Sequence, residues 1–354
     1  MDELFKSLSP LEKLGQRFIF GTNTENIEII ESLIKNYHIG GVILYKKNYK
    51  NYEDMIEVIK RLKNANKDNK VPLFTAVDQE GGIVNRMPDE VHILKNIYDV
   101  TKKNSLLVND YAKVIGKMLS ECGINVNLAP VLDIYNHSTS GAVYKRCFYG
   151  DSDNIVKLGE RYIKELANSN VLAVVKHFPG HGITKVDSHR LVPYVRNYQE
   201  ILNVHMKPFN ELMDKTEAIM IGHIAIKKLT GFLPASISDR FIKKYIREKN
   251  NFEGLIITDE INMLRRHPLY SFIFMEKALK SSNDLLLVKI NSVKGGAKFI
   301  EKYKKICNLK KLDESVERIL KIKEKYHIND NVENLGMNIE EINEMIDNIN
   351  NNLE

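Results

Sequence analysis

Hydrophobic residues gather along this chain in short runs, separated by longer stretches in which apolar positions recur with a helical period. Eight such runs occur, and each is almost uniformly apolar, as expected of parallel strands that are buried on both faces. They are Phe18–Phe20, Val42–Tyr45, Leu73–Val77, Val126–Ala129, Leu172–Val175, Ala218–Ile221, Leu255–Ile257 and Leu285–Val288.

A helical pattern follows each run. In the second of these stretches, apolar residues fall at Met55, Ile56, Ile59 and Leu62, which places them on one face of a helix. A strand followed by a helix, repeated eight times, predicts an α/β fold with a single (β/α)8 TIM-type barrel and a C-terminal helical tail. The predicted helices are Ile27–Lys35, Tyr52–Asn66, Leu106–Glu121, Ile155–Ala167, Glu200–Asp214, Arg240–Lys249, Phe272–Leu279 and Ala297–Cys307.

No linker rich in Pro, Gly or Ser divides the chain. We therefore predict one catalytic barrel domain over residues 1–328. Residues 329–354 are polar, acidic and rich in Asn, which predicts a C-terminal helix packed on the barrel or a partly disordered tail.

Composition narrows the class of protein. Hydrophobic residues make up 43% and charged residues 28% of the 354, which is typical of a globular protein. The three cysteines, Cys122, Cys147 and Cys307, form no CxxC pair, so we expect neither a disulfide framework nor a metal site. Together with an acidic start that has no apolar core, this predicts a cytoplasmic protein.

The charge pattern bears on the partners. The net charge is +6, but the lysines are scattered and no arginine-rich block is present, so we expect no nucleic-acid partner. No run approaches the roughly 20 apolar residues of a membrane span. We expect a monomer or a weak dimer.

Charged and imidazole side chains follow five of the eight runs. In a barrel enzyme the active site lies at the carboxyl ends of the strands, so these side chains are predicted to converge. Bringing five polar segments together in a concave site costs free energy because their side chains lose water, so we expect these side chains to bind a ligand or to take part in catalysis. They begin with Asp78-Gln79-Glu80, Asp133, Lys176-His177, His223 and Asp259-Glu260.

The segment after the fifth run is the most informative. It reads KHFPGHGITKVDSH over residues 176–189 and holds three histidines. Asp187 and His189 stand two residues apart, so in an extended segment they point to the same side. A carboxylate beside an imidazole raises its basicity and fixes its tautomer, as a proton-transferring histidine needs.

KHFPGHGITKVDSH resembles the signature of the β-N-acetylglucosaminidase branch of glycoside hydrolase family 3. The blocks LSPLEKLGQRFIFG, GGVILYKKN, AVDQEGGIVNRM, GINVNLAPVLDI and FEGLIITDEINM are similar to that family in the same order, over roughly residues 8–290. The resemblance implies a retaining exo-β-N-acetylglucosaminidase that removes terminal β-linked N-acetylglucosamine, from cell-wall or peptidoglycan fragments, without a metal or organic cofactor.

The resemblance also implies roles for single residues. Asp259 matches the catalytic nucleophile, His189 the general acid/base and Asp187 its partner. A second set matches residues that bind the hydroxyls of the terminal sugar, and a retaining glycosidase needs a nucleophilic carboxylate and an acid of this kind. The second set is Asp78, Arg86, Arg146, Lys176 and His177.

Several conspicuous residues have simpler interpretations. We predict that Glu80 orders the loop after the third strand and that His181 is structural, while His223 either lines the pocket or is a satisfied core group, the second being favoured. Gly81-Gly82 is too short to be a phosphate cradle. Cys147 is expected to be a small buried residue.

Two further functions stay open on the same scaffold. An imidazole acid/base repels an incoming phosphate less than a carboxylate does, so a β-N-acetylglucosaminide phosphorylase is one alternative. The other is a catalytically inactive sugar-binding barrel. Retention of Asp187, His189 and Asp259 together favours an enzyme.

Overall fold

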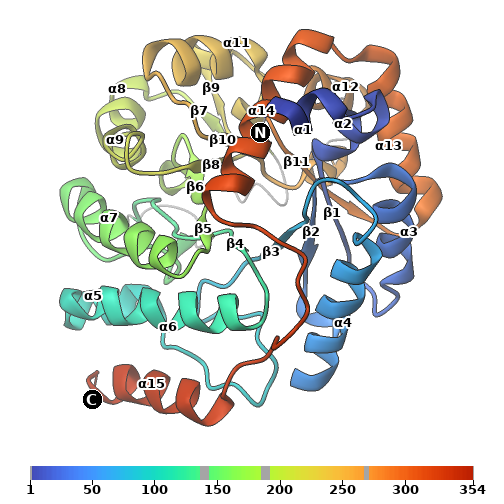
Figure 1. The fold of residues 1–354 in the computed structure, drawn as a ribbon. Coiled ribbons are helices and arrows are strands. Elements are labelled where there is room, and N and C mark those ends of the chain that lie inside the picture. The colour runs from blue at the N-terminus through green and yellow to red at the C-terminus, as the bar shows by residue number, and fades with distance from the viewer. Residues whose placement is uncertain (1, 136–142, 185–191, 267–270, 354) are drawn as a thin grey trace.

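The strands of the barrel follow one another around a closed ring. The computed structural model describes residues 2–135, 143–184, 192–266 and 271–353. Six parallel strands run in the order β11-β1-β2-β3-β4-β5, and three more in the order β10-β8-β6 (Figure 1). A parallel bridge between Ile257 and Leu285 joins β10 to the start of β11 and closes the ring. The (β/α)8 barrel predicted from the sequence is therefore confirmed.

Each predicted apolar run contains one strand, apart from the fifth, which is divided at Val174 into β5 and β6. A separate two-stranded sheet pairs β7 (Tyr194–Val195) with β9 (Ala225–Ile226). The barrel strands are β1 (Phe18–Thr22), β2 (Gly41–Leu44), β3 (Phe74–Val77), β4 (Val126–Asn127), β5 (Leu172–Ala173), β6 (Val175–Phe178), β8 (Ala218–Ile221), β10 (Leu255–Thr258) and β11 (Leu286–Ile290).

Alternate side chains of the strands face inward, which explains why the runs are apolar at nearly every position. One buried cluster contains Ile19, Ile43 and Phe74 together with inward-facing residues of β4, β5, β8, β10 and β11. Side chains of the other parity, such as Phe18 and Phe20, belong to the cluster beneath the helices. Because both faces are buried, polar residues within the runs are rare, and two of them, Thr75 and Asn127, are themselves fully buried.

Helices cover the outside of the barrel where the sequence predicts them, with two irregular intervals. The stretch 198–211 consists of α8 (Tyr198–Glu200), a π-helical turn at Ile201–His205 and α9 (Lys207–Glu211), and α11 (Asp239–Phe241) continues into a π-helical segment at Ile242–Lys249. The regular covering helices are α3 (Glu28–Tyr37), α4 (Tyr52–Ala65), α6 (Val108–Glu121), α7 (Ser152–Asn168), α12 (Ser271–Lys280) and α13 (Val293–Ile306).

Five helices were not predicted. Four are short: α1 (Asp2–Ser7), α2 (Pro10–Gln16), α5 (Ile97–Lys103) and α10 (Lys227–Thr230). The fifth, α14 (Leu309–Lys325), closes the end of the barrel opposite the predicted site. Ile319 and Ile322 of α14 join the inward-facing cluster, and Lys323 Nζ donates to the carbonyl oxygens of Gly40 and Pro72, just before β2 and β3.

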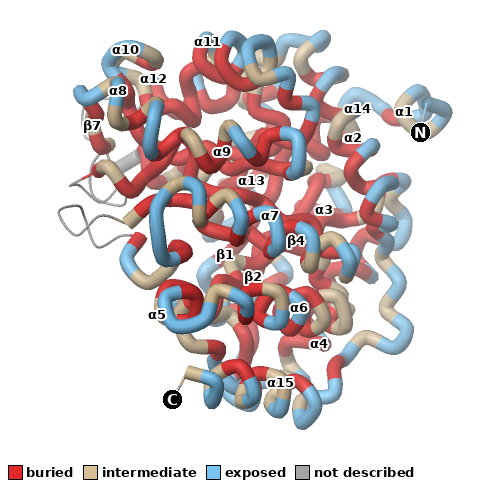
Figure 2. Tube along the Cα trace, turned by 90° about the vertical axis from the view of Figure 1, so that its left-hand side faces the viewer, coloured by how far each residue is buried: buried red, intermediate tan, exposed pale blue. Residues whose placement is uncertain are grey.

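The C-terminal segment ends in a packed helix. After α14 the chain crosses in front of the strands in the view of Figure 1 and ends in α15 (Ile339–Asn351). Helix α15 packs beside α6, with Ile342, Ile346 and Ile349 buried (Figure 2). The predicted C-terminal helix is thus present. Within the described residues, none of the helices combines the length and the apolar character that crossing a membrane requires.

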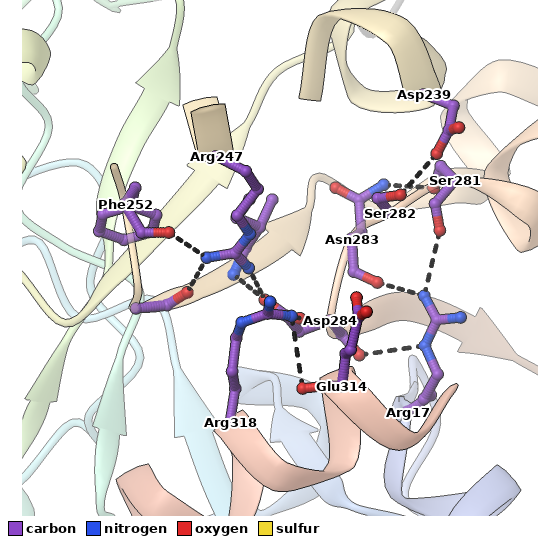
Figure 3. Close-up of polar contacts among 12 residues, drawn as sticks. Arg17, Asp239, Arg247, Phe252, Ser281, Ser282, Asn283, Asp284, Glu314 and Arg318 are labelled. Carbon is purple, nitrogen blue, oxygen red and sulfur yellow. Dashed lines mark hydrogen bonds and ion pairs between the residues drawn. The ribbon is translucent and has the colours of Figure 1, made fainter. Parts of the chain in front are cut away.

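A buried polar network fastens the closing strand (Figure 3). The Asp284 carboxylate has no exposed surface and accepts hydrogen bonds from Arg247, from Arg318 Nη1 at 3.1 Å and from the backbone N–H of Ile256 at 2.8 Å. The buried Arg17 donates to the carbonyl oxygens of Asn283 and Asp284. These contacts link the start of β11 to β10, to α14 and to the residue before β1. They reinforce the junction of β10 and β11, which in the described residues are joined by the single bridge between Ile257 and Leu285.

Candidate active site

A cavity of about 510 Å³ opens at the carboxyl ends of the strands. Its apolar lining includes Ile43, Leu128, Met220 and Leu287, three of which are strand residues that also fill the barrel interior. Six of the predicted site residues line it, so the folded barrel brings together positions far apart in the sequence. These six are Asp78, Arg86, Arg146, Lys176, His177 and Asp259. The other two, Asp187 and His189, lie outside the described residues.

Lys176 lies at the centre of an ion-pair cluster. Its ammonium is 2.8 Å from Asp78 Oδ1 and 2.6 Å from Glu80 Oε1, and its side chain is almost fully buried. Burial alone would lower the pKa of Lys176, but the charges of Asp78 and Glu80 outweigh it and raise the pKa above its usual value. Lys176 therefore stays charged and holds Asp78 at the cavity wall.

Arg146 is held by Glu80, the same carboxylate that contacts Lys176. Its Nε and Nη2 atoms lie 2.9 Å and 2.8 Å from the two Glu80 oxygens, in the bidentate geometry that favours Arg over Lys. Burial would raise the pKa of Glu80, but the Lys176 and Arg146 cations hold it well below its usual range. Glu80 thus orders the two cations, and its predicted role in organising this loop fits the geometry.

Asp133 orients His177. Asp133 Oδ2 lies 2.7 Å from His177 Nδ1, and Asp133 Oδ1 accepts the backbone N–H of His181 at 2.5 Å. Burial would raise the pKa of Asp133, but the hydrogen bond and charge of His177 outweigh it and lower the pKa. An ionised Asp133 fixes a proton on Nδ1 of His177, which leaves Nε2 as the ring atom able to contact a ligand.

Asp259 comes directly after β10 and stands beside a second carboxylate. It is half-buried, its backbone N–H donates to Ile221 O at 3.0 Å, and its Oδ1 accepts the N–H of Glu260 at 2.7 Å. Glu260 is itself held in place, because its Oε1 accepts the N–H of Asn262 at 3.0 Å. Asp259 is therefore fixed by backbone contacts at the edge of the cavity.

Arg86 enters the cavity from the loop after β3. Gly81 and Gly82 turn this loop with φ of 83° and 55°, and a side chain at Gly81 would collide with Tyr111 Oη at 1.9 Å. The Arg86 backbone is held by hydrogen bonds with Gln79 Oε1 and Tyr49 Oη. Its Nε is buried and has no hydrogen-bond partner within the part of the chain the structure describes.

His223, Cys147 and His181, for which the sequence suggested structural roles, have the following surroundings. His223 is buried and does not line the cavity, and its ring nitrogens contact Ser236 Oγ at 2.6 Å and Glu260 O at 3.0 Å. It is therefore a satisfied core group, the favoured one of the two alternatives. Cys147 is fully buried, also as predicted. His181 bonds to Thr184 Oγ1 through Nδ1 at 2.9 Å but also lines the cavity, so its position is more than structural.

The sequence reasoning missed Tyr45, Lys47 and Lys289, which all line the cavity. Tyr45 was counted as the last residue of an apolar run. Burial first, and then the charges of Asp78 and Glu260, raise its pKa well above its usual value, so its hydroxyl stays protonated among the carboxylates. Lys289 Nζ lies 4.4 Å from the centre of the Tyr45 ring. Applying the strand-end rule to β2 and β11 would have found all three.

Comparisons with known proteins agree with this architecture. Residues 11–322 match the family described as the glycosyl hydrolase family 3 N terminal domain. A beta-hexosaminidase of Haemophilus influenzae is 32% identical over 277 residues, which cover 76% of this chain and 77% of the relative. Beta-hexosaminidase A of Pseudoalteromonas piscicida is 31% identical over 255 residues, and the chain spans only 43% of its length.

Among solved structures, a glycoside hydrolase family 3 beta-N-acetylglucosaminidase from a Paenibacillus species superposes with a TM-score of 0.87 at 25% sequence identity. The superposition covers 98% of this chain and 69% of that one. The likeness therefore extends over the whole barrel and the C-terminal helix, not only over the motifs at the strand ends.

Proposed function

Because the chain belongs to glycosyl hydrolase family 3 and is a glycoside hydrolase, we propose that it removes terminal β-linked N-acetylglucosamine by double displacement through a covalent glycosyl-enzyme. The observation that carries this proposal is the position of Asp259. It is a fixed carboxylate at the edge of a cavity whose other polar groups suit a sugar.

In the first step an oxygen of Asp259 attacks the anomeric carbon, and the bond from that carbon to the leaving oxygen breaks. The imidazolium of His189, paired with Asp187, gives its proton to the leaving oxygen. In the second step neutral His189 takes a proton from water, the water oxygen attacks the anomeric carbon, and the bond to Asp259 breaks. The sugar is released with its original anomeric configuration.

The remaining residues bind and orient the sugar. Asp78 accepts hydrogen bonds from sugar hydroxyls, while Arg86, Lys176 and His177 Nε2 complete the polar wall. Arg146 acts mainly by holding Glu80 and thereby Lys176, since its guanidinium is already committed to a bidentate pair. The positive charge of Arg86 and Lys176 favours an ionised Asp259.

The test is hydrolysis of an aryl β-N-acetylglucosaminide by wild type and Asp259→Ala. The variant should lose turnover, and added azide should restore release of the aryl group and yield the α-glycosyl azide, because azide replaces the missing nucleophile on the opposite face. Asp214→Asn, a change at an exposed carboxylate, is the matched control. Wild-type activity in Asp259→Ala would remove Asp259 as nucleophile.

Phosphorolysis is a second candidate on the same residues. Among the described residues that line the cavity, cationic side chains outnumber carboxylates, and a positive lining attracts an anionic acceptor such as phosphate. Sugar 1-phosphate among the products at high phosphate would identify a phosphorylase, and free N-acetylglucosamine alone would identify the hydrolase. Binding of N-acetylglucosamine without any product would indicate an inactive barrel.

The source of the substrate and the cellular setting belong to the same proposal. Cell-wall or peptidoglycan fragments in the cytoplasm are the proposed substrates, and a reducing compartment fits three cysteines that are all free. Incubation with purified peptidoglycan fragments, followed by mass spectrometry of released N-acetylglucosamine, tests the source.

A further inference from the structure

The described residues that line the candidate active site carry more positive charge than their carboxylates neutralise. Six cationic side chains and four carboxylates are among the described residues that line the cavity. Three of the cations have carboxylate partners: Lys176 and Arg146 within the cavity wall, and Lys46 with Asp89 outside it. The other three, Arg86, Lys47 and Lys289, form no ion pair within the described ranges.

A neutral sugar explains Arg86 but not the two lysines. Arg86 is already proposed as a ligand of the hydroxyl groups. Lys47 is exposed and Lys289 is half-buried, and no described carboxylate pairs with either ammonium group, so both are available to an opposite charge on a ligand. The Tyr45 ring, 4.4 Å from Lys289 Nζ, holds this ammonium in place without neutralising it.

The two lysines also lie on one side of the barrel. Lys289 is in β11 and Lys47 follows β2, and only β1 stands between these strands in the sheet. His177 and His181 come from the end of β6, three strands away from each of them around the ring. Lys289 lies against the Tyr45 ring, and the charges of Asp78, Arg86 and Asp259 act on the pKa of Tyr45. This side of the cavity therefore adjoins the residues that are proposed to hold the terminal sugar.

We propose that the terminal sugar bound by this cavity carries an anionic substituent, such as a phosphate, sulfate or carboxylate, which Lys289 and Lys47 bind. The inference rests on the proposed function and deepens it, because it names the class of sugar that the same site prefers. A hydrogen bond to a charged group contributes enough free energy to change specificity about tenfold or more.

The first experiment compares kcat/KM for four aryl β-N-acetylglucosaminides: the neutral sugar, its 6-phosphate, its 6-sulfate and its 3-O-carboxymethyl ether. At least one anionic sugar should be preferred over the neutral one by about tenfold. In Lys289→Met and Lys47→Met the ratio of the anionic to the neutral kcat/KM should fall towards one. Lys67→Met, at an exposed position outside the cavity lining, should leave the ratio unchanged.

Several results would overturn the inference. A wild-type preference for the neutral sugar over all three anionic ones is one, and an unchanged ratio in both lysine variants is another. If inorganic phosphate speeds turnover of the neutral sugar and Lys289→Met abolishes that effect, the lysines bind a free acceptor and not a substituent.

A binding measurement separates this inference from the proposed function. If no glycoside is turned over, the proposed function fails, but calorimetry can still compare free N-acetylglucosamine 6-phosphate with N-acetylglucosamine. The phosphate form should bind about tenfold more tightly to wild type, and Lys289→Met should remove the difference. Equal affinities in the wild type would reject the anionic substituent.

Discussion

His177 Nδ1 lies 2.7 Å from Oδ2 of Asp133, a carboxylate with no exposed surface. His177 lies in β6 and Asp133 follows β4, and the backbones beside them are joined by a bridge between Val131 and Lys176. The pair therefore holds one cavity-lining imidazole rigidly while its partner stays away from solvent. A ring held in this way presents the same nitrogen to every ligand.

Asp133→Asn tests the orientation of His177. The amide can donate to Nδ1 and so favour the wrong tautomer, and it loses the charge-assisted bond to His181 N. We expect kcat/KM on an aryl β-N-acetylglucosaminide to fall by about tenfold to hundredfold, the equivalent of one charge-assisted hydrogen bond. Circular dichroism serves as the folding control, and wild-type kcat/KM in a folded variant would contradict the role of Asp133.

Glu80→Gln tests the cluster around Lys176. The change removes the carboxylate that Lys176 and Arg146 share, so two buried cations lose their common partner. Breaking a buried ion pair in this way costs about 3–5 kcal/mol in the free energy of unfolding, measured by urea denaturation. Asp89→Asn removes an exposed partner of Lys46 and should change stability little. Similar losses in both variants would argue against a special role for Glu80.

The same carboxylate predicts a pH dependence. Because the folded protein lowers the pKa of Glu80, the unfolded chain binds more protons than the folded one between the two pKa values. Glu80 therefore contributes stability above the unfolded value, about 4.3, and loses it as the pH falls towards the folded pKa. Between pH 5 and 3, about one unit on either side of that value, the unfolding free energy of wild type should decline more steeply than that of Glu80→Gln. Parallel profiles would refute this.

Asp284→Ala tests how the barrel closes. Asp284 is the shared acceptor for Arg247, Arg318 and the N–H of Ile256, so its loss leaves two guanidinium groups and one backbone donor without their partner (Figure 3). We expect a loss of about 3–5 kcal/mol in urea unfolding. Asp313→Ala, which removes a half-exposed partner of Lys13, is the control and should lose much less.

Truncation tests the proposed division into a barrel of residues 1–328 and a tail of residues 329–354. Asp330 lies in the tail, but its carboxylate accepts from Asn66 Nδ2 at 2.7 Å and from Leu73 N at 3.2 Å, at the base of the barrel. A chain that ends at residue 331 should therefore melt at a higher temperature than one that ends at 328. No residue of α15 lines the cavity, so the longer chain should keep its activity. Equal melting temperatures would show that Asp330 contributes nothing.

Much of the fold could be predicted from local patterns. A strand buried on both faces is apolar at nearly every position, so runs such as Ala218–Ile221 can be recognised in the sequence without knowledge of the neighbouring strands. Helix α14 escaped this reasoning, although Leu312, Val316 and Ile319 recur at helical spacing, because eight strand-helix pairs already completed the pattern. Its role depends on contacts with β2 and β3, more than 200 residues earlier.

Some residues of the candidate site could likewise be predicted from the sequence, whereas others could not. The strand-end rule and the family motifs identified Asp78, Lys176, His177 and Asp259, which the barrel brings into one cavity. Tyr45 was hidden inside an apolar run, and Lys289 stands in a strand without a recognised motif. The roles of Asp187 and His189 rest on the resemblance alone.

The sequence by itself determined the order of the strands, the covering helices and the end of the barrel at which polar groups collect, because each depends on the period of apolar residues and on the residue types at the end of each run. Only the tertiary structure decided the partners. The pairing of Arg146 with Glu80, of His177 with Asp133 and of Lys289 with Tyr45 joins residues 66, 44 and 244 positions apart. Such pairs depend on which strand ends become neighbours in the folded barrel. The local period of apolar residues contains no information about contacts between residues so far apart in the sequence.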